Sequence, residues 1–473
     1  MRQILPIPIV GPTRFARYPK ISREATYNMM ITDDALIAFP GYSKIRNLSP
    51  GSTMGRSIYK SPKYNHGIVV MDNGVFSVNS DFSVAFIGSL DSFSGPVYIT
   101  ENNANEIVIS DNSSDLYIFN YQAQTFNKVN IGFRTGYITF QDGYIIAPEL
   151  DTSRWRLSEL NNASSFPDNA QSVGLIQSQP DVVVSCETLQ RQLFIFGENI
   201  TEVWLNVPNP QVPFTYQRQN SLSIEYGCVS PNTIASGFNR LVWLGSNEYS
   251  APSILVSTGG VPRKITTDGI DFELDQLTKP EDSFGFLFEE SGHVFYQITF
   301  PTDEVSYAYD FNTDSFFNVT DHNLNAHIAR KISYFNGRHL FITDKNGGLF
   351  EMGTNIFVYK ETNDDDDPGF TIPRGRILPN FRLPGSKRFV TDAASLTIEQ
   401  GYSNDPLKVD LSLSKDGSQT YGSKWTKYLK SMGDRPNKLI YRKLGAANDL
   451  SMQFQFWGRD RFVITGGEME VYK

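Results

Sequence analysis

The sequence has only two cysteines, Cys186 and Cys228, among its 473 residues. Two cysteines cannot build the framework of cross-links that holds small secreted domains together, so a disulfide scaffold is excluded. Both lie at the ends of apolar stretches, and free cysteine is among the most buried residue types. We therefore expect two small buried side chains in a protein that folds in a reducing compartment.

Long helical periodicity and long apolar runs are also missing. No apolar run approaches the length needed to cross a membrane, so we expect no membrane-spanning segment. The apolar start of the chain is broken by Pro6 and Pro8, which excludes the apolar core of a signal peptide. Because proline forbids helix, we expect an extended N-terminal arm over Arg2–Pro12.

Basic residues are fewer than acidic ones. The chain has 42 Lys and Arg against 51 Asp and Glu, which gives a formal net charge of −9. Proteins whose main task is to grip nucleic acid carry basic surfaces, so this balance argues against such a role. It leaves open a surface that DNA passes without attaching to it.

Motifs for catalysis and metal binding are equally scarce. The five histidines show no zinc-ligand spacing, and the sequence contains neither a GxSxG elbow nor a defensible Cys–His arrangement. Residues 417–424 end in Ser-Lys, the reverse of the order that a P-loop requires. We therefore predict no cofactor and no metal site, and we assign no catalytic or ligand-binding residue.

What the sequence does contain is a unit that recurs between Gly67 and Tyr359. Each copy is a short apolar strand, a polar turn and a second apolar strand, at spacings on the order of 30–55 residues. The seven pairs are Ile68–Met71 with Val75–Val78, Ile107–Ile109 with Leu116–Phe119, Tyr137–Phe140 with Tyr144–Ala147, Leu193–Phe196 with Thr201–Leu205, Leu241–Leu244 with Ile254–Val256, Val294–Phe300 with Val305–Tyr309, and Leu340–Thr343 with Leu349–Glu351. Strand-rich repeats of this period are typical of a β-propeller.

The repeat and its flanks predict an all-β chain in four parts. Residues 1–52 form an N-terminal arm and a lead-in strand, and the lead-in contributes to the last blade, because a donated strand removes an open sheet edge. Residues 53–360 form the propeller, whose third copy is interrupted by the polar insertion Asp151–Gln171. Residues 361–369 form an acidic linker, and residues 370–473 contain seven short strand candidates that predict a C-terminal β-sandwich.

Two acidic features have a structural and a functional interpretation. The linker contains four consecutive aspartates, whereas calcium loops space their ligands alternately, so a solvated linker is favoured over a calcium site. Residues 414–421 approximate an Asp box, a turn in which the Asp416 carboxylate bonds to nearby backbone N–H groups. Asp boxes occur in sialidase propellers, but this one lies outside the predicted propeller, which favours a structural turn.

Several stretches resemble one known family. Tyr18-Pro19-Lys20 through Tyr27–Met30, followed by Phe39–Tyr42, are similar to the N-terminal signature of the tail hub proteins of short-tailed bacteriophages. These are also called packaged-DNA stabilization proteins, tail accessory factors or tail nozzles. Further similarity lies in residues 179–181, 197–204, 226–228, 411–422, 441–445 and 468–471. The resemblance runs in the family's order from about Ile4 to Val471.

The resemblance implies a non-enzymatic structural protein of the virion tail that assembles in the host cytoplasm. It implies a homohexameric ring below the portal-adaptor ring, which continues the DNA channel, retains the packaged genome, and anchors tail fibres or spikes and a plug or needle. Together with the net charge of −9, it predicts an acidic or neutral bore through which genomic DNA passes without sequence-specific binding. We also expect the apolar arm Met1–Val10 to be buried against another subunit or the adaptor.

Two other functions stay open at this point. One is a glycan-binding propeller, which in a bacterium would carry an export signal. The other is a sialidase-like enzyme, which would need an arginine cluster and a Tyr–Glu pair at the propeller's centre, and several Asp boxes. Because one fold hosts many functions, the propeller alone does not decide among them.

Overall fold

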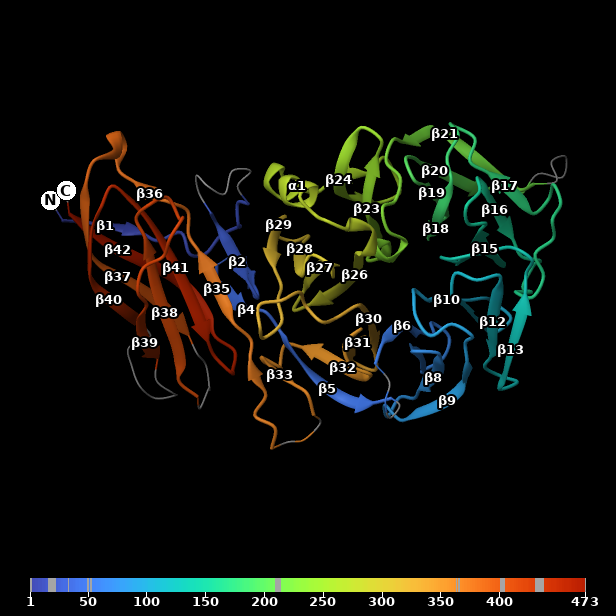
Figure 1. Ribbon diagram of the computed structural model, residues 1–473, viewed down its shortest axis with the longest axis horizontal. Coiled ribbons are helices and arrows are strands. Elements are labelled where there is room, and N and C mark those ends of the chain that lie inside the picture. The colour runs from blue at the N-terminus through green and yellow to red at the C-terminus, as the bar shows by residue number, and fades with distance from the viewer. Residues whose placement is uncertain are drawn as a thin grey trace.

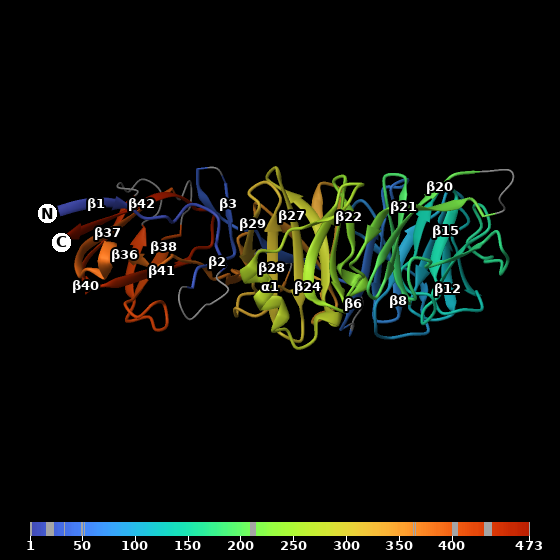
Figure 2. The same ribbon diagram turned by 90° about the horizontal axis from the view of Figure 1, so that it is seen from above.

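The computed structural model describes residues 2–15, 23–32, 34–48, 51, 53–208, 214–362, 364, 366–399, 405–429 and 438–472. Strands dominate these residues; the helical elements among them are α1 (Asp268–Asp275) and the 3₁₀ turns η1 (Pro231–Thr233), η2 (Pro280–Asp282) and η3 (Pro384–Ser386). Figure 1 shows a wheel of sheets joined to a β-sandwich at the left, where both termini lie, and Figure 2 shows the same two parts from above. The predicted all-β class is confirmed.

The wheel is a propeller whose described residues form seven blades, each with four antiparallel strands. The blades are β6 (Gly55–Lys60), β7 (Gly67–Met71), β8 (Gly74–Val78) and β9 (Val84–Ser89); β10 (Tyr98–Glu101), β11 (Glu106–Ser110), β12 (Asp115–Asn120) and β13 (Thr125–Asn130); β14 (Thr139–Gln141), β15 (Tyr144–Pro148), β16 (Arg154–Leu157) and β17 (Val173–Leu175); β18 (Val183–Leu189), β19 (Gln192–Gly197), β20 (Thr201–Asn206) and β21 (Tyr216–Ile224); β22 (Ala235–Gly237), β23 (Arg240–Asn247), β24 (Ser250–Ser257) and β25 (Arg263–Lys264); β26 (Phe284–Glu290), β27 (His293–Phe300), β28 (Val305–Asp310) and β29 (Ser315–Asn318); and β30 (Lys331–Phe335), β31 (Arg338–Ile342), β32 (Gly348–Gly353) and β5 (Gly41–Asn47). The first strand of each blade contacts the first strand of the next, so the inner strands form a closed ring.

The third blade corrects one prediction. Asp151–Gln171, predicted as a polar insertion, contains the blade's third strand, β16. In β16 the side chains of Trp155 and Leu157 are buried, while Arg156 forms an ion pair with Glu149 at 2.8 Å. The charged residues that led to the prediction of an insertion therefore lie on one face of a strand, and Glu149, just after β15, supplies their counter-ion.

The propeller is closed by the lead-in, as predicted. The donated strand is β5, which pairs antiparallel with β32, whereas the apolar stretch before it forms β4 (Leu36–Ala38) in the sandwich. Beyond β5 the sheet continues into β33 (Val358–Lys360) and β34 (Phe370–Thr371). The acidic stretch 361–369 connects β33 to β34; Asn363 and Asp365 lie outside the described residues, and the Asp367 carboxylate accepts a hydrogen bond from the Gly369 N–H at 2.8 Å.

The C-terminal part is a sandwich of two sheets. One sheet has the strands β3 (Met29–Ile31), β4, β42 (Val463–Tyr472), β37 (Phe389–Glu399) and β40 (Lys438–Ala447), with β1 (Arg2–Pro6) added beside β42. The other has β2 (Ala25–Tyr27), β35 (Arg374–Ile377), β41 (Asp449–Trp457), β38 (Leu407–Ser414) and β39 (Trp425–Leu429), with β36 (Phe381–Arg382) beside β41. Leu396, Leu411 and Phe454 are among the buried side chains that fill the space between the sheets.

The N-terminal arm overturns a second expectation. Strand β1 pairs along its whole length with β42 of the same chain, from Arg2 opposite Tyr472 to Pro6 opposite Glu468. Ile7 and Ile9, just after it, are buried in the core of the sandwich. The expectation that the arm must be buried by a neighbouring subunit was wrong, because the chain's own last strand offers it an open edge.

Candidate functional site

At the end where the inner strands begin, their closed ring surrounds a hollow of about 560 Å³, lined by residues from most of the blades. We call this hollow the channel. Its charged lining residues are Arg56, Lys279, Arg330 and Lys331, with the carboxylates of Asp282 and Asp344. Both signs of charge therefore meet at this opening.

The two arginines at this opening are engaged in holding the fold. Arg56 donates hydrogen bonds to four backbone carbonyls, those of Asp72, Ser92, Ser94 and Gly95, and to the Ser92 hydroxyl. The Arg330 Nε lies 2.7 Å from an Asp344 carboxylate oxygen, and its guanidinium stacks on the Phe284 ring at 4.3 Å. Neither guanidinium is therefore free to bind the carboxylate of an acidic sugar, as a sialidase would require.

Lys331 and Glu187 are charged residues on the inner strands of different blades. The Lys331 ammonium donates to the Ser57 hydroxyl at 3.3 Å, and burial lowers the pKa of Lys331 to about 8 against the opposing effect of Glu187. The Glu187 carboxylate accepts hydrogen bonds from the Tyr137 hydroxyl at 2.6 Å and the Thr139 hydroxyl at 3.0 Å. This arrangement ties blades to one another but does not join a nucleophile to a general base.

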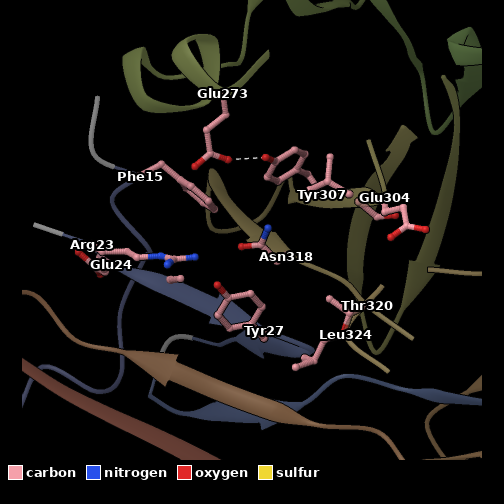
Figure 3. A pocket seen from close by; sticks show the side chains of 13 residues that line it. Phe15, Arg23, Glu24, Tyr27, Glu273, Glu304, Tyr307, Asn318, Thr320 and Leu324 are labelled. Atoms are coloured by element: carbon pink, nitrogen blue, oxygen red, sulfur yellow. Dashed lines mark hydrogen bonds between the residues drawn. The ribbon is translucent and has the colours of Figure 1, made fainter. Parts of the chain in front are cut away.

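A second hollow, of about 270 Å³, lies where the propeller meets the lead-in. Figure 3 shows Glu273 of α1 and Tyr307 of β28 joined on one side of it, with Tyr27 and Leu324 on the other. Burial raises the pKa of Glu273, while the hydrogen bond from Tyr307 and the charge of Arg23 act in the opposite direction. The pocket is thus a polar seam between the wheel and the segment that leads to the sandwich.

Two buried arginines on β35 lock this seam. Arg374 donates to the carbonyls of Phe39 and Phe357, each at 3.0 Å, and burial lowers its pKa to about 9. Arg376 donates to the Thr13 hydroxyl at 2.7 Å and forms an ion pair with Glu24 at 2.8 Å.

The sheets also cross the seam. Strand β2 pairs parallel with β29 of the sixth blade on one side and antiparallel with β35 on the other, so one sheet runs from the propeller into the sandwich. Propeller and sandwich are therefore held together by backbone pairing as well as by buried charge.

Residues singled out from the sequence have structural roles. Cys186 and Cys228 are free and buried, as predicted, and burial raises the pKa of both thiols. Asp416 accepts hydrogen bonds from the Ser414 hydroxyl at 2.6 Å and the Thr420 N–H at 3.1 Å, which confirms the structural turn. The described residues include no group of three or more His, Cys, Asp or Glu side chains that could hold a metal ion, and no helix among them is long and apolar enough to span a membrane.

Residues 17–355 match the protein family described as "Bacteriophage P22 Gp10, beta-propeller". The chain belongs to this family. It is a structural protein of a phage tail, so the resemblance seen in the sequence is confirmed. The curated proteins compared with the chain contain no match.

Solved structures with a similar fold are distant. A streptogramin B lyase has 12% sequence identity, a TM-score of 0.45 and coverage of 66% of this chain and 97% of its own. Virginiamycin B lyase from Staphylococcus aureus has 12% identity, a TM-score of 0.46 and coverage of 66% and 99%, and U3-55K has 9% identity, a TM-score of 0.40 and the same coverage. Similarity at this level carries no argument about function.

The channel and seam residues were not found from the sequence. The available indication for Arg56 and Arg330 was their place just at or before the first strand of a blade, where the side chain reaches the channel. Arg374 and Arg376 flank Gly375 in a short strand whose polar sequence predicts exposure to solvent. Arg374 contacts Phe39 and Arg376 contacts Thr13, and each pair is more than 300 residues apart in the sequence. A local sequence pattern therefore cannot predict these contacts.

Proposed function

We propose that this chain is the subunit of a homohexameric ring in the tail of a short-tailed phage. The ring continues the DNA channel below the portal-adaptor ring, retains the packaged genome, and anchors tail fibres or spikes and a plug or needle. It is a non-enzymatic virion component assembled in the host cytoplasm. The observation that carries the proposal is the family match over residues 17–355.

The architecture suits a load-bearing ring. Strand β5 closes the wheel by pairing with β32, so the edge of β32 is not left unpaired. The sheet of the sixth blade continues into the sandwich. The buried Arg374 and Arg376 join backbone segments that are far apart in sequence. A subunit braced in this way transmits force to its neighbours instead of bending at a linker.

The proposal includes weak contact with DNA. Each lysine or arginine that neutralises a phosphate releases a counter-ion and strengthens attachment, so a bore that lets the genome leave quickly should be acidic or neutral. In filter binding at low salt, the assembled ring should hold duplex DNA no more tightly than the non-specific range of about 10⁻⁴–10⁻⁶ M. Tight binding with a steep salt dependence would contradict a passive conduit.

The decisive experiment uses particles made with and without this chain. Heads filled in its absence should lose DNA and become sensitive to DNase, and purified protein added before the nuclease should restore protection. Electron microscopy of the purified protein and of restored particles should show six-fold rings below the portal. If particles without the chain retain their DNA and carry complete tails, the proposal is wrong.

The sialidase-like alternative is not favoured by any observation at the channel. A sialidase would use several free arginines there, whereas Arg56 and Arg330 are engaged by backbone carbonyls, Asp344 and Phe284. Release of sialic acid from a fluorogenic sialoside by the purified protein would reopen that alternative.

A further inference from the structure

The net charge of −9 combines parts of the chain that carry opposite net charges. Residues 53–360, in which most of the propeller lies, carry 18 Lys and Arg against 33 Asp and Glu, a net −15. Residues 370–473, the C-terminal part, carry 17 Lys and Arg against 10 Asp and Glu, a net +7. One chain therefore carries an acidic wheel and a basic sandwich.

The sandwich has exposed cations that form no ion pair with any described residue. They include Lys387, Arg388, Lys415, Arg442, Lys443 and Arg461. Three of them gather at β40, which is the edge strand of its sheet: Arg442 and Lys443 belong to β40, and the Lys415 ammonium lies against Gly445 of the same strand. We call Lys415, Arg442 and Lys443 the basic edge; Figure 1 shows β40 on the side of the sandwich away from the propeller.

The propeller has a hollow whose lining includes three carboxylates and two exposed aromatic rings, together with Arg338 and His339. A groove of about 680 Å³ lies over blades five to seven, lined among others by Phe238, Glu289, Glu290 and Tyr334. We call these four residues the aromatic groove. The two rings are exposed, Phe238 at 49% and Tyr334 at 62%.

Glu289 and Glu290 form no ion pair closer than 3.8 Å with a described residue. The ring nitrogen of His339 approaches the Glu290 carboxylate only to 3.8 Å, because the same nitrogen is 2.7 Å from the Glu289 carbonyl. Burial raises the pKa of Glu290, while the charge of His339 and hydrogen bonds from Thr354 act in the opposite direction. Glu289 is exposed and accepts a hydrogen bond from the Gly292 N–H at 3.0 Å.

Phe238 is held in a backbone conformation that its side chain disfavours. It has φ 50° and the next residue, Asn239, has φ 56°, as in a two-residue hairpin turn where Asn and Gly are preferred. The other phenylalanine with positive φ, Phe82 at 61°, packs against Phe335. Phe238 has no such compensation within the described chain, so its strain and exposure together point to a contact outside the subunit.

We propose that the basic edge of one subunit docks into the aromatic groove of the next subunit in the ring. A closed ring of identical copies uses two different surfaces that fit each other, and this chain carries one surface of each charge. Lysine and arginine bind to exposed aromatic faces and to carboxylates, which are the groups that the groove offers. The inference rests on the proposed ring and names the residues that hold it together.

The test compares two variants of the full chain by analytical ultracentrifugation and native mass spectrometry. Phe238→Gly relieves the backbone strain, so it should keep or raise the melting temperature while weakening ring assembly by roughly tenfold or more. Arg442→Glu combined with Lys443→Glu should weaken assembly to a similar extent. Added salt should weaken the wild-type ring, because the contact is between opposite charges.

Matched controls separate the contact from general effects. Tyr249→Ala removes an exposed aromatic ring outside the groove, and Lys345→Glu reverses an exposed cation of the propeller. Both should leave assembly and melting temperature unchanged. Equal losses in the controls and the test variants would overturn the inference.

The outcomes distinguish this inference from the proposed function. Normal rings in both test variants would overturn the inference and leave the ring in place. Loss of rings in Phe238→Gly alone would show that the groove contacts a surface of the next subunit other than the basic edge. Intact rings with lost duplex-DNA binding in the doubly reversed variant would assign the basic edge to DNA. Either result overturns the inference. Absence of rings for the wild-type protein in solution and in particles would refute the proposed function itself.

Discussion

The Glu24 carboxylate lies 2.8 Å from the Arg376 guanidinium, in the seam where the lead-in crosses between propeller and sandwich. Both side chains are almost completely removed from solvent. Burial raises the pKa of Glu24 and lowers that of Arg376, and each partner's charge opposes the shift of the other. Each charge is therefore tolerated in the interior because the other is present.

Removing one member of this pair should be costly. Arg376→Met leaves the Glu24 carboxylate buried without its partner, which we expect to lower the free energy of unfolding by about 3–5 kcal/mol. The matched control is Arg382→Met on the sandwich surface, where the side chain is 51% exposed and its ion pair with Asp449 should contribute little to stability, because solvent screens the two charges. Urea unfolding measures both, and equal losses would show that the seam does not depend on this pair.

Two glycines paired across the closing strand offer a second test. Gly41 of β5 lies opposite Gly353 of β32, but a β-carbon at Gly41 would lie 2.5 Å from the Val358 carbonyl oxygen, whereas none at Gly353 would meet an atom within 4 Å. Gly41→Ala should therefore destabilise the chain by about 1–3 kcal/mol, because backbone atoms must move. Gly353→Ala should be neutral or slightly stabilising. Thermal melts that rank the two variants in the reverse order would contradict this account of closure.

The N-terminal arm should stabilise its own sandwich. Ile9 is fully buried in the sandwich core, so Ile9→Ala should cost about 2–5 kcal/mol. Ile4, on β1, is 60% exposed, and Ile4→Ala should change stability by no more than about 0.5 kcal/mol. Urea unfolding of the monomeric protein checks both; a harmless Ile9→Ala would show that the arm is not part of the sandwich core.

Acid should destabilise the propeller through His327. Burial lowers the pKa of this imidazole to about 3 from its ordinary value of 6.5, so the unfolded chain takes up a proton before the folded chain does. The stability that this histidine contributes is present above pH 6.5 and is lost as the pH falls toward 3, by a difference on the order of 3 kcal/mol at pH 4.

The variant His327→Gln isolates this effect. Burial raises the pKa of Glu24, Glu273 and Glu290, so these carboxyls favour folding at low pH and lose that contribution as the pH rises through their folded values above 4.5. They are present in both proteins and cancel in the difference. Urea midpoints between pH 7 and pH 4 should therefore fall more steeply for the wild type than for His327→Gln, and parallel curves would contradict the buried neutral imidazole.

Local sequence determined much of the wheel. Apolar strands separated by polar turns specify hairpins without help from distant residues, which is why pairs such as Ile68–Met71 with Val75–Val78 appear as β7 and β8. The same locality explains Asp416, whose hydrogen-bond partners Ser414 and Thr420 are at most four residues away. Both features could be predicted from the sequence because every interaction that defines them lies within one turn.

Tertiary structure decided those features of the fold that depend on contacts between residues far apart in the sequence. The N-terminal arm, which we predicted to contact a neighbouring subunit, pairs with the open edge of β42. Strand β5, which precedes the first blade in the sequence, pairs with β32 of the last blade. Arg376 is tolerated in the interior because Thr13 and Glu24 arrive there from the start of the chain. The groove between Phe238 and Tyr334 likewise exists because consecutive blades pack side by side, which places blades five and seven on either side of blade six. Composition and periodicity describe neighbours along the chain, whereas burial of charge and pairing of edges depend on neighbours in space.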